Sequence, residues 1–189
     1  MNKDLIEKVI REVRRADFVL PKYYGEVGID APLPIGFGQT ISQPTTVKMM
    51  LEWLDAKTGD KVLDVGSGSG WTTALLSNIV GEKGGVYAVE RVPELKEFGE
   101  KNCAKAGIKN AKFYLADKKI FGLSKFAPYD RILVSASAQE LPQELIEQFK
   151  IGGKLVVPVG DSILEISKKT KDDIDIIEHY GFVFVPLIK

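Results

Sequence analysis

Apolar and polar positions in the first 55 residues predict two helices on either side of an irregular stretch. Residues 3–15 carry apolar side chains at the spacing of one helix face, with charged residues between them. Residues 18–44 contain four Pro and four Gly, which is too many for long regular elements. Such a stretch within a compact domain is usually functional, for example as a lid or a substrate-binding segment. The second helix covers residues 44–55, with Pro44 suited to its first turn and Ser42 as a candidate cap.

From residue 61 onward, short apolar runs alternate with stretches of helical periodicity. The predicted strands cover residues 61–65, 86–90, 111–115, 130–134 and 154–157. The predicted helices cover residues 71–80, 94–106 and 142–149. This alternation is typical of a parallel, doubly wound sheet with helices on its faces.

The end of the chain has a different pattern, because no helical stretch separates its three apolar runs, residues 162–167, 174–179 and 182–187. We therefore expect the sheet to end in antiparallel edge strands. The lysines in the intervening turn, Lys168, Lys169 and Lys171, predict a solvated hairpin tip.

Together these patterns predict an α/β fold with a doubly wound, mostly parallel, Rossmann-like sheet. Antiparallel C-terminal edge strands and an N-terminal helical and loop extension complete it. We expect one domain over residues 1–189, in which residues 1–55 cover a core formed by residues 56–189.

The composition narrows the class of protein. The 26 basic and 26 acidic residues give a formal net charge of zero, so charge gives no reason to expect nucleic acid or an anionic membrane as a partner. Cys103 and His179 are too few for a zinc site or for Cys–His or Ser–His–Asp catalysis, and we interpret His179 as a solvated strand or turn residue. We expect no metal. We expect a cytoplasmic protein, since no signal peptide or membrane span is evident, and a monomer, since no exposed heptad or apolar stripe calls for an oligomer.

Residues 62–70, Val-Leu-Asp-Val-Gly-Ser-Gly-Ser-Gly, predict a buried strand that enters a glycine-rich turn before a helix. Such a turn lets the backbone approach a ligand closely, and the helix N-terminus offers unpaired N–H groups. A P-loop would need a lysine here, and a dinucleotide-binding loop would need Gly or Ala at the position of Trp71. The remaining interpretation is the Gly-x-Gly-x-Gly loop of class I methyltransferases, which the preceding Asp64 favours.

Carboxylates follow the next two predicted strands. Glu90 is suited to accept hydrogen bonds from both hydroxyls of a ribose, and an ion pair with Arg91 or a nearby Lys is the alternative. Asp117 is suited to accept a hydrogen bond from an adenine amino group, and a turn-capping role is its alternative. Because the carboxyl ends of parallel strands meet at one sheet edge, these residues and the glycine loop predict a site for S-adenosylmethionine.

Residues 32–44 read Pro-Leu-Pro-Ile-Gly-Phe-Gly-Gln-Thr-Ile-Ser-Gln-Pro, which resembles the signature of protein-L-isoaspartate O-methyltransferases. The resemblance continues at residues 13–19, 62–70, 128–132, 152–160 and 185–187, and so covers nearly the whole chain. It implies a repair enzyme that moves a methyl group from S-adenosylmethionine to the free α-carboxylate of L-isoaspartyl residues. The products are S-adenosylhomocysteine and a methyl ester that returns through a succinimide to aspartate.

The resemblance also implies roles for individual residues. Ser42 matches the serine regarded as the active-site residue of the family, and its hydroxyl would orient the substrate carboxylate. The cofactor-binding residues it implies are Gln39, Thr40, Ile41, Ser42, Asp64, Gly66, Ser67, Gly68, Ser69, Glu90, Arg91, Asp117 and Lys118. The substrate-binding residues it implies are Ser42, Val185, Pro186 and Leu187.

Departures from the family pattern leave two other interpretations open. The chain has Ala116-Asp117-Lys118-Lys119 where the family has Gly-Asp-Gly, which brings a Lys side chain near the expected adenine edge. One alternative is a class I methyltransferase with a different substrate, and the other is a non-catalytic relative that binds S-adenosylmethionine. The run Ser135-Ala136-Ser137-Ala138 stands in place of the Asn-Pro-Pro-Tyr-type motif of base amino-methylation, which argues against nucleic-acid bases as substrates.

Overall fold

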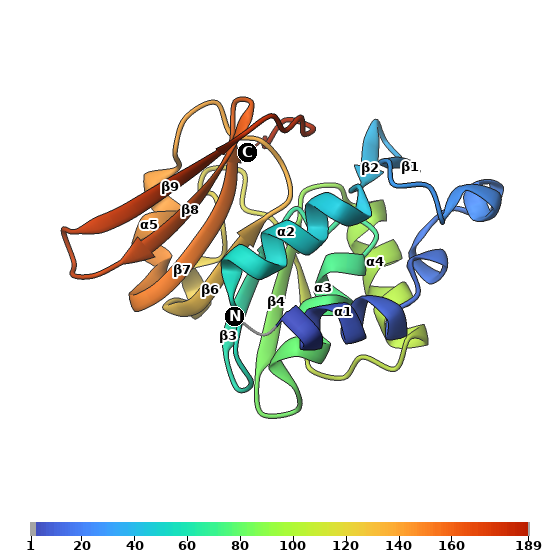
Figure 1. The fold of residues 1–189 in the computed structure, drawn as a ribbon, viewed down its shortest axis with the longest axis horizontal. Coiled ribbons are helices and arrows are strands. Elements are labelled where there is room, and N and C mark those ends of the chain that lie inside the picture. Colours follow the sequence, from blue (N-terminus) through green and yellow to red (C-terminus); the bar gives the residue numbers. More distant parts are fainter. Residues whose placement is uncertain (1–2, 189) are drawn as a thin grey trace.

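A seven-stranded sheet forms the centre of the computed structural model, which describes residues 3–188 (Figure 1). In sheet order its strands are β5 (Ala111–Leu115), β4 (Gly85–Glu90), β3 (Lys61–Val65), β6 (Tyr129–Val134), β7 (Phe149–Val159), β8 (Ser162–Lys168) and β9 (Ile174–Tyr180). Neighbouring strands from β5 to β7 are parallel, and β8 and β9 pair antiparallel. The predicted mostly parallel sheet with antiparallel strands at its C-terminal end is confirmed.

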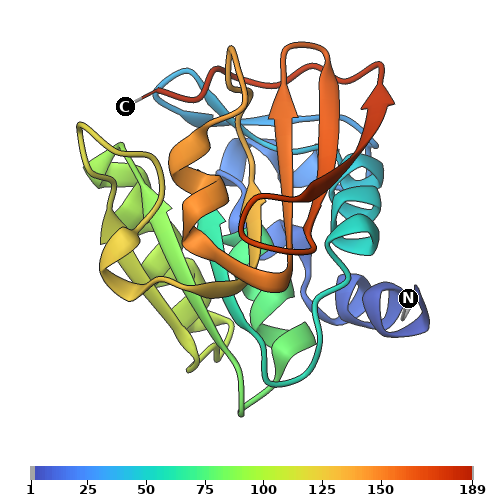
Figure 2. The ribbon, with the colours of Figure 1, turned by 90° about the vertical axis from the view of Figure 1, so that its left-hand side faces the viewer.

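Helices cover both faces of this sheet, as the alternating pattern predicts. They are α1 (Lys3–Glu12), α2 (Pro44–Leu54), α3 (Trp71–Val80), α4 (Pro93–Lys105) and α5 (Gln143–Gln148). Adjacent β3 residues divide between two cores, because Val62 packs with α1 to α4 and Leu63 packs with α5 on the other face. Figure 2 shows α2 and α5 on opposite sides of the sheet.

The irregular N-terminal stretch consists of short elements, two 3₁₀ turns (Arg15–Phe18 and Pro21–Glu26) and a small hairpin of β1 (Leu33–Gly36) and β2 (Gln39–Ile41). Helix α2 begins at Pro44 as predicted, but the cap position is Gln43. The prediction that Ser42 caps this helix is therefore wrong. The carboxylate of Asp30, from the preceding loop, instead accepts hydrogen bonds from the Thr45 amide (2.9 Å) and hydroxyl (2.7 Å).

The third C-terminal edge strand, predicted over residues 182–187, is not formed. Residues 181–188, the C-terminal strap, run across the carboxyl ends of the parallel strands and make a single bridge between Pro186 and Ser137. The amide of Ser137 donates to the Val185 carbonyl (2.8 Å), and the amide of Leu187 donates to the Ser137 carbonyl (2.7 Å). An apolar run thus serves as a cover over the sheet edge.

Two side chains that the sequence predicts to be solvated are packed. Lys168 is 8% exposed, and its ammonium group donates to the carbonyls of Ile146 and Phe149 at the end of α5. Burial lowers the pKa of Lys168. His179 stacks on Trp53 of α2 with ring centroids 3.8 Å apart. Both side chains are covered because the hairpin of β8 and β9 lies between α5 and α2.

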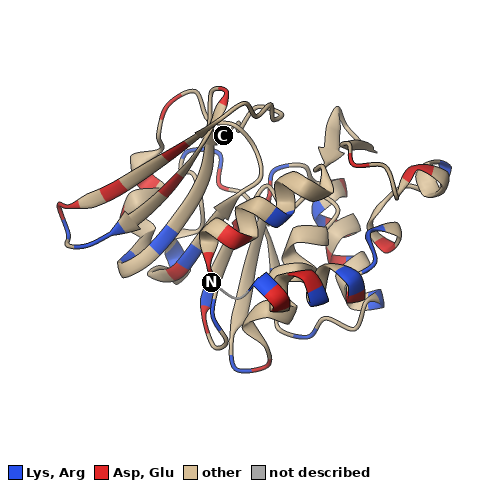
Figure 3. Cartoon of the chain, in the orientation of Figure 1, with Lys and Arg blue, Asp and Glu red and all other residues tan. Residues whose placement is uncertain are grey.

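Charged residues of both signs are mixed along the helices (Figure 3). Helix α1 is tied to α2 by an ion pair in which Lys48 Nζ lies 2.7 Å from Glu7 Oε1. No helix within residues 3–188 is long and apolar enough to cross a membrane.

Candidate active site

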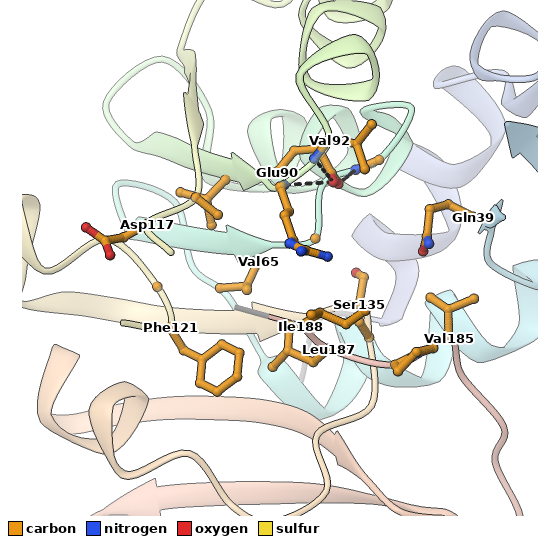
Figure 4. A pocket seen from close by; sticks show the side chains of 18 of the residues that line it. Gln39, Val65, Glu90, Val92, Asp117, Phe121, Ser135, Val185, Leu187 and Ile188 are labelled. Carbon is orange, nitrogen blue, oxygen red and sulfur yellow. Dashed lines mark hydrogen bonds between the residues drawn. The ribbon is translucent and has the colours of Figure 1, made fainter. Parts of the chain in front are cut away.

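The carboxyl ends of β3, β4, β5 and β6 surround a cavity that the C-terminal strap closes from one side (Figure 4). Figure 4 shows Glu90 and Val92 across the cavity from Leu187 and Ile188. This strand-end cavity is lined by Ile35, Gln39, Thr40, Val65, Gly66, Gly68, Val89, Glu90, Arg91, Val92, Ala116, Asp117, Ile120, Phe121, Gly122, Ser135, Ala136, Val185, Pro186, Leu187 and Ile188.

A second cavity adjoins the first and contains Ser42 in its wall. This Ser42 cavity is lined by Pro32, Thr40, Ser42, Gln43, Thr46, Ser135, Gly181, Phe182, Val183, Phe184 and Val185. Thr40, Ser135 and Val185 line both cavities. The two spaces therefore meet at these three side chains, which come from β2, the end of β6 and the strap.

The glycine loop after β3 has its shape because α4 lies directly against it. A Cβ atom at Gly99 of α4 would lie 2.7 Å from the Gly68 carbonyl oxygen, and one at Gly70 would lie 2.7 Å from the Gly99 carbonyl oxygen. One helical turn further, the Asn102 side-chain amide donates to the Ser69 carbonyl (3.0 Å). The loop is thus held at its backbone by α4, and Gly66 and Gly68 remain at the cavity wall.

Glu90 ends β4 with its carboxylate fixed by backbone amides. Oε1 accepts from the amides of Arg91 (2.8 Å) and Val92 (3.0 Å), and Oε2 accepts from the amide of Gly68 (2.9 Å). The side chain is 7% exposed and lines the cavity. Backbone amides rather than an ion pair therefore hold the carboxylate at the place where the sequence predicts a ribose.

Asp64, one position before the end of β3, is completely buried and does not line the cavity. Its Oδ2 accepts a hydrogen bond from the Thr73 hydroxyl (2.6 Å), and its Oδ1 has no hydrogen-bond partner among the described residues. Burial, with a smaller contribution from the charge of Glu90, raises the pKa of Asp64 to about 7. Asp64 therefore connects the strand to α3 beneath the glycine loop.

Asp117 lines the cavity beyond β5, and its Oδ1 also accepts a hydrogen bond from the Lys119 amide (2.7 Å). The turn-capping interaction that the sequence left as an alternative is thus present together with the position at the cavity. The neighbouring Lys118 is exposed and is not part of the wall.

The structure brings most of the predicted site residues together. Ten of them line the strand-end cavity, namely Gln39, Thr40, Gly66, Gly68, Glu90, Arg91, Asp117, Val185, Pro186 and Leu187. Ser42 lies in the adjoining cavity. The predicted residues that line neither cavity are Ile41, Asp64, Ser67, Ser69 and Lys118. Of these, Ile41 is 4% exposed and packs into the core.

Sequence reasoning did not single out several residues of the wall. Ile120 and Phe121 provide apolar surface next to Asp117, and no spacing signal marked the loop after β5 that carries them. Ser135 follows β6, the neighbour of β3, and lies between the two cavities. A signal for Ser135 was available, because ligands of open α/β sheets bind at the carboxyl ends of adjacent strands.

Neither Cys103 nor His179 lines either cavity. The thiol of Cys103 is 2% exposed and lies 3.3 Å from the Gly70 carbonyl oxygen. Burial raises the pKa of this thiol to about 12, which keeps it protonated and unreactive at neutral pH. The cysteine packs α4 against the glycine loop.

The strand-end cavity fits an adenosyl cofactor. Its continuous wall contains the glycine loop after β3, the carboxylate at the end of β4 and apolar side chains beyond β5. With the seven-stranded sheet, these features define a class I methyltransferase that uses S-adenosylmethionine.

The chain belongs to the protein-L-isoaspartate(D-aspartate) O-methyltransferase family, whose model matches residues 1–189. The protein-L-isoaspartate O-methyltransferase of Pyrococcus horikoshii is 45% identical over 100% of this chain and 86% of the relative. The corresponding protein of Thermococcus onnurineus is 42% identical over 100% of this chain and 87% of the relative.

Solved structures agree with this assignment. The structure of a protein-L-isoaspartate O-methyltransferase from Plasmodium falciparum, in complex with S-adenosyl-L-homocysteine, is 27% identical to this chain. It superposes with a TM-score of 0.85 over 99% of this chain and 91% of that chain. Another protein-L-isoaspartate O-methyltransferase is 30% identical, with a TM-score of 0.86 over 97% of this chain. The present chain spans 61% of the length of that second structure.

Replacement of Gly99 by Ala should weaken cofactor binding. The new Cβ would displace the Gly68 carbonyl, which lies 2.7 Å away, and with it the loop. We expect the Kd of S-adenosylhomocysteine, measured by calorimetry, to rise about tenfold or more, which corresponds to about 1.4 kcal/mol. Gly85→Ala is the matched control, because its Cβ would meet only the Asn110 carbonyl oxygen at 3.7 Å. Equal affinities for the two variants would contradict this account of the loop.

Asp64 should make folding stability depend on pH. Its pKa is raised from 3.8 to about 7, so the folded protein binds a proton that the unfolded chain releases between these values. Stability from this group is complete below pH 3.8 and decreases as pH rises to about 7. We therefore expect the free energy of unfolding of Asp64→Asn, measured with denaturant, to increase relative to that of wild type as pH rises through this interval. If the free energies of unfolding of wild type and variant differ by the same amount at every pH in this interval, Asp64 is ionised in the folded state.

Proposed function

We propose that this chain transfers the methyl group of S-adenosylmethionine to the free α-carboxylate of L-isoaspartyl residues in damaged proteins and peptides. The family match over residues 1–189 supports this activity over a different methyltransferase substrate or a non-catalytic relative. The observation that carries the proposal is that the strand-end cavity and the Ser42 cavity meet at Thr40, Ser135 and Val185.

The strand-end cavity is the proposed cofactor site. Gly66 and Gly68 would face the amino-acid part, Glu90 the ribose hydroxyls, and Asp117 with Phe121 the adenine. When bound, the cofactor supplies a methyl group that is activated by its bond to a positively charged sulfur.

The Ser42 cavity is the proposed site of the isoaspartyl residue. A carboxylate is ionised at neutral pH and is already a nucleophile, so no general base has to remove a proton from it. The Ser42 hydroxyl, which has no hydrogen-bond partner among the described residues, is the proposed donor that orients this carboxylate. Thr40, Ser135 and Val185 would then form the passage through which the two reacting groups face each other.

The C-terminal strap has two proposed tasks. Its residues Phe182 to Val185 line the Ser42 cavity, and Val185 to Ile188 line the cofactor side. The bonds from Ser137 hold the strap across the sheet edge, so it would exclude water from both spaces at once. Its extended backbone between two cavities also suits recognition of a peptide substrate through main-chain groups.

The chemistry that follows methylation completes the repair. The amide nitrogen of the next residue attacks the methyl ester carbonyl, methanol leaves, and a succinimide ring forms. Water then opens the ring to aspartate or isoaspartate, and only isoaspartate returns as substrate. Ester formation is the step proposed for this chain. It replaces the carboxylate oxygen, a poor leaving group, by a methoxy group that can leave as methanol.

The mixture of acidic and basic residues along the helices supports a peptide over nucleic acid as partner (Figure 3). We infer that the protein is a monomer in the cytoplasm, as its sequence pattern predicts.

Methyl transfer from labelled S-adenosylmethionine to two peptides that differ only in isoaspartate or aspartate at one position tests the proposal. We expect base-labile label in the isoaspartyl peptide alone, because the extra backbone methylene places the free α-carboxylate where a normal Asp side chain does not reach. Label in both peptides, or in neither while S-adenosylhomocysteine binds, would contradict the proposed substrate.

Removal of the Ser42 hydroxyl tests the proposed orientation of the carboxylate. We expect Ser42→Ala to lower kcat/KM for the isoaspartyl peptide about tenfold or more, which is the effect of losing one hydrogen bond to a charged group. Cofactor affinity should change little, since Ser42 does not line the strand-end cavity. Ser124→Ala, at an exposed position outside both cavities, is the matched control. Full turnover by Ser42→Ala would remove Ser42 from the mechanism.

A further inference from the structure

Arg15 is a buried cation whose hydrogen bonds, among the described residues, all go to main-chain carbonyls. Its side chain is 7% exposed, and it begins the 3₁₀ turn that follows α1. The guanidinium donates to the carbonyls of Val27 (3.3 Å), Ile29 (3.2 Å), Ala31 (2.7 Å) and Ser42 (3.1 Å). Four acceptors from two parts of the chain thus converge on one side chain.

These acceptors are supplied by the loop that leads to β1 and by the residue that follows β2. Both belong to the segment over residues 27–42, which provides Pro32 and Ser42 to one cavity and Ile35 and Gln39 to the other. The Ser42 carbonyl is bonded to Arg15, so the backbone that carries the Ser42 hydroxyl is held directly.

A guanidinium suits this task better than another cation. Its planar fork presents five N–H groups in fixed directions, whereas an ammonium group presents three that rotate about a flexible stem. Withdrawal of a charge from water is costly unless its hydrogen bonds are replaced. The four carbonyls accept hydrogen bonds from Nη1 and Nη2, while Nε has no hydrogen-bond partner among the described residues. These bonds form only when residues 27–42 follow their folded path, so the buried cation favours that path over others.

Arg15 is also anchored to the rest of the fold. Its guanidinium carbon lies 5.7 Å from the ring centroid of Trp71, the first residue of α3. The Trp71 indole in turn donates to the Val13 carbonyl (3.2 Å), just before Arg15. Arg15 and Trp71 therefore connect the segment that carries Ser42 to α3, the helix that follows the glycine loop.

We propose that Arg15 is a positioning residue for the isoaspartyl peptide, because its bonds to the backbone of residues 27–42 set the place of Ser42 and the wall of the Ser42 cavity. This inference rests on the proposed function. Arg15 lines neither cavity, so it acts through the segment and not by contact with substrate.

Arg15→Lys, compared with Arg14→Lys, tests the proposal in the full chain. Both substitutions keep the charge, but the two hydrogen bonds from Arg14 to Asp17 (2.7 and 3.0 Å) lie at the exposed surface, where an ion pair contributes little to stability. We expect Arg15→Lys to raise KM for the isoaspartyl peptide tenfold or more, with the Kd of S-adenosylhomocysteine changed less than threefold. Arg14→Lys should leave both values unchanged. An unchanged KM, or an equal loss of cofactor affinity, would overturn the proposal.

A second variant acts on the same segment from its exposed side. Asp30→Ala removes the carboxylate that ties this loop to the start of α2 and leaves Arg15 in place. We expect amide hydrogen exchange over residues 27–42 to become faster in Arg15→Lys and in Asp30→Ala, while exchange in β3 and α3 stays as in wild type. Faster exchange throughout Arg15→Lys would show a general structural role and would overturn the proposal.

The exchange measurement also separates this proposal from the proposed function. A wild-type chain that fails to methylate the isoaspartyl peptide would contradict the function, while segment-specific exchange would still support the anchoring of residues 27–42 by Arg15. Slow exchange of that segment in Arg15→Lys would contradict the anchoring, whatever the activity of the wild type.

Discussion

The close approach of α4 to the glycine loop is the constraint on which the site depends. Gly70 and Gly99 have no side chains to separate the two backbones, and Asn102 and Cys103 bind the loop carbonyls on the next turn. With the loop held in this place, the Gly68 amide donates to the Glu90 carboxylate (2.9 Å). Backbone groups of the glycine loop therefore help to fix the Glu90 carboxylate at the wall of the strand-end cavity.

Much of this framework was predictable from local sequence. The alternation of apolar runs and helical stretches predicts β3 to β6 and α3 to α5 within one residue, because each element is marked by its own periodicity. Strand β7, predicted over residues 154–157, is longer and covers Phe149–Val159. The glycine loop, Glu90 and Asp117 were predictable as a site because the parallel sheet brings the ends of successive strands to one edge. Ser42 was assigned through a family resemblance and not through its local pattern.

The features that escaped prediction depend on contacts between residues far apart in the chain. The C-terminal strap has the apolar composition of a strand, and its course is decided by hydrogen bonds to Ser137 at the end of β6. Lys168 has a polar sequence context, yet the ends of α5 and β8 meet and cover it. Arg15 binds carbonyls up to 27 residues away, a distance at which periodicity carries no information.

A crystal structure of the chain with S-adenosylhomocysteine and an isoaspartyl peptide would test the central claim most directly. We expect the nucleoside in the strand-end cavity, the peptide in the Ser42 cavity, and the sulfur facing the isoaspartyl carboxylate between Thr40, Ser135 and Val185. The carboxylate oxygen should lie about 3 to 3.5 Å from the position of the transferred methyl group. A peptide bound away from this passage, or a sulfur directed away from it, would contradict the account.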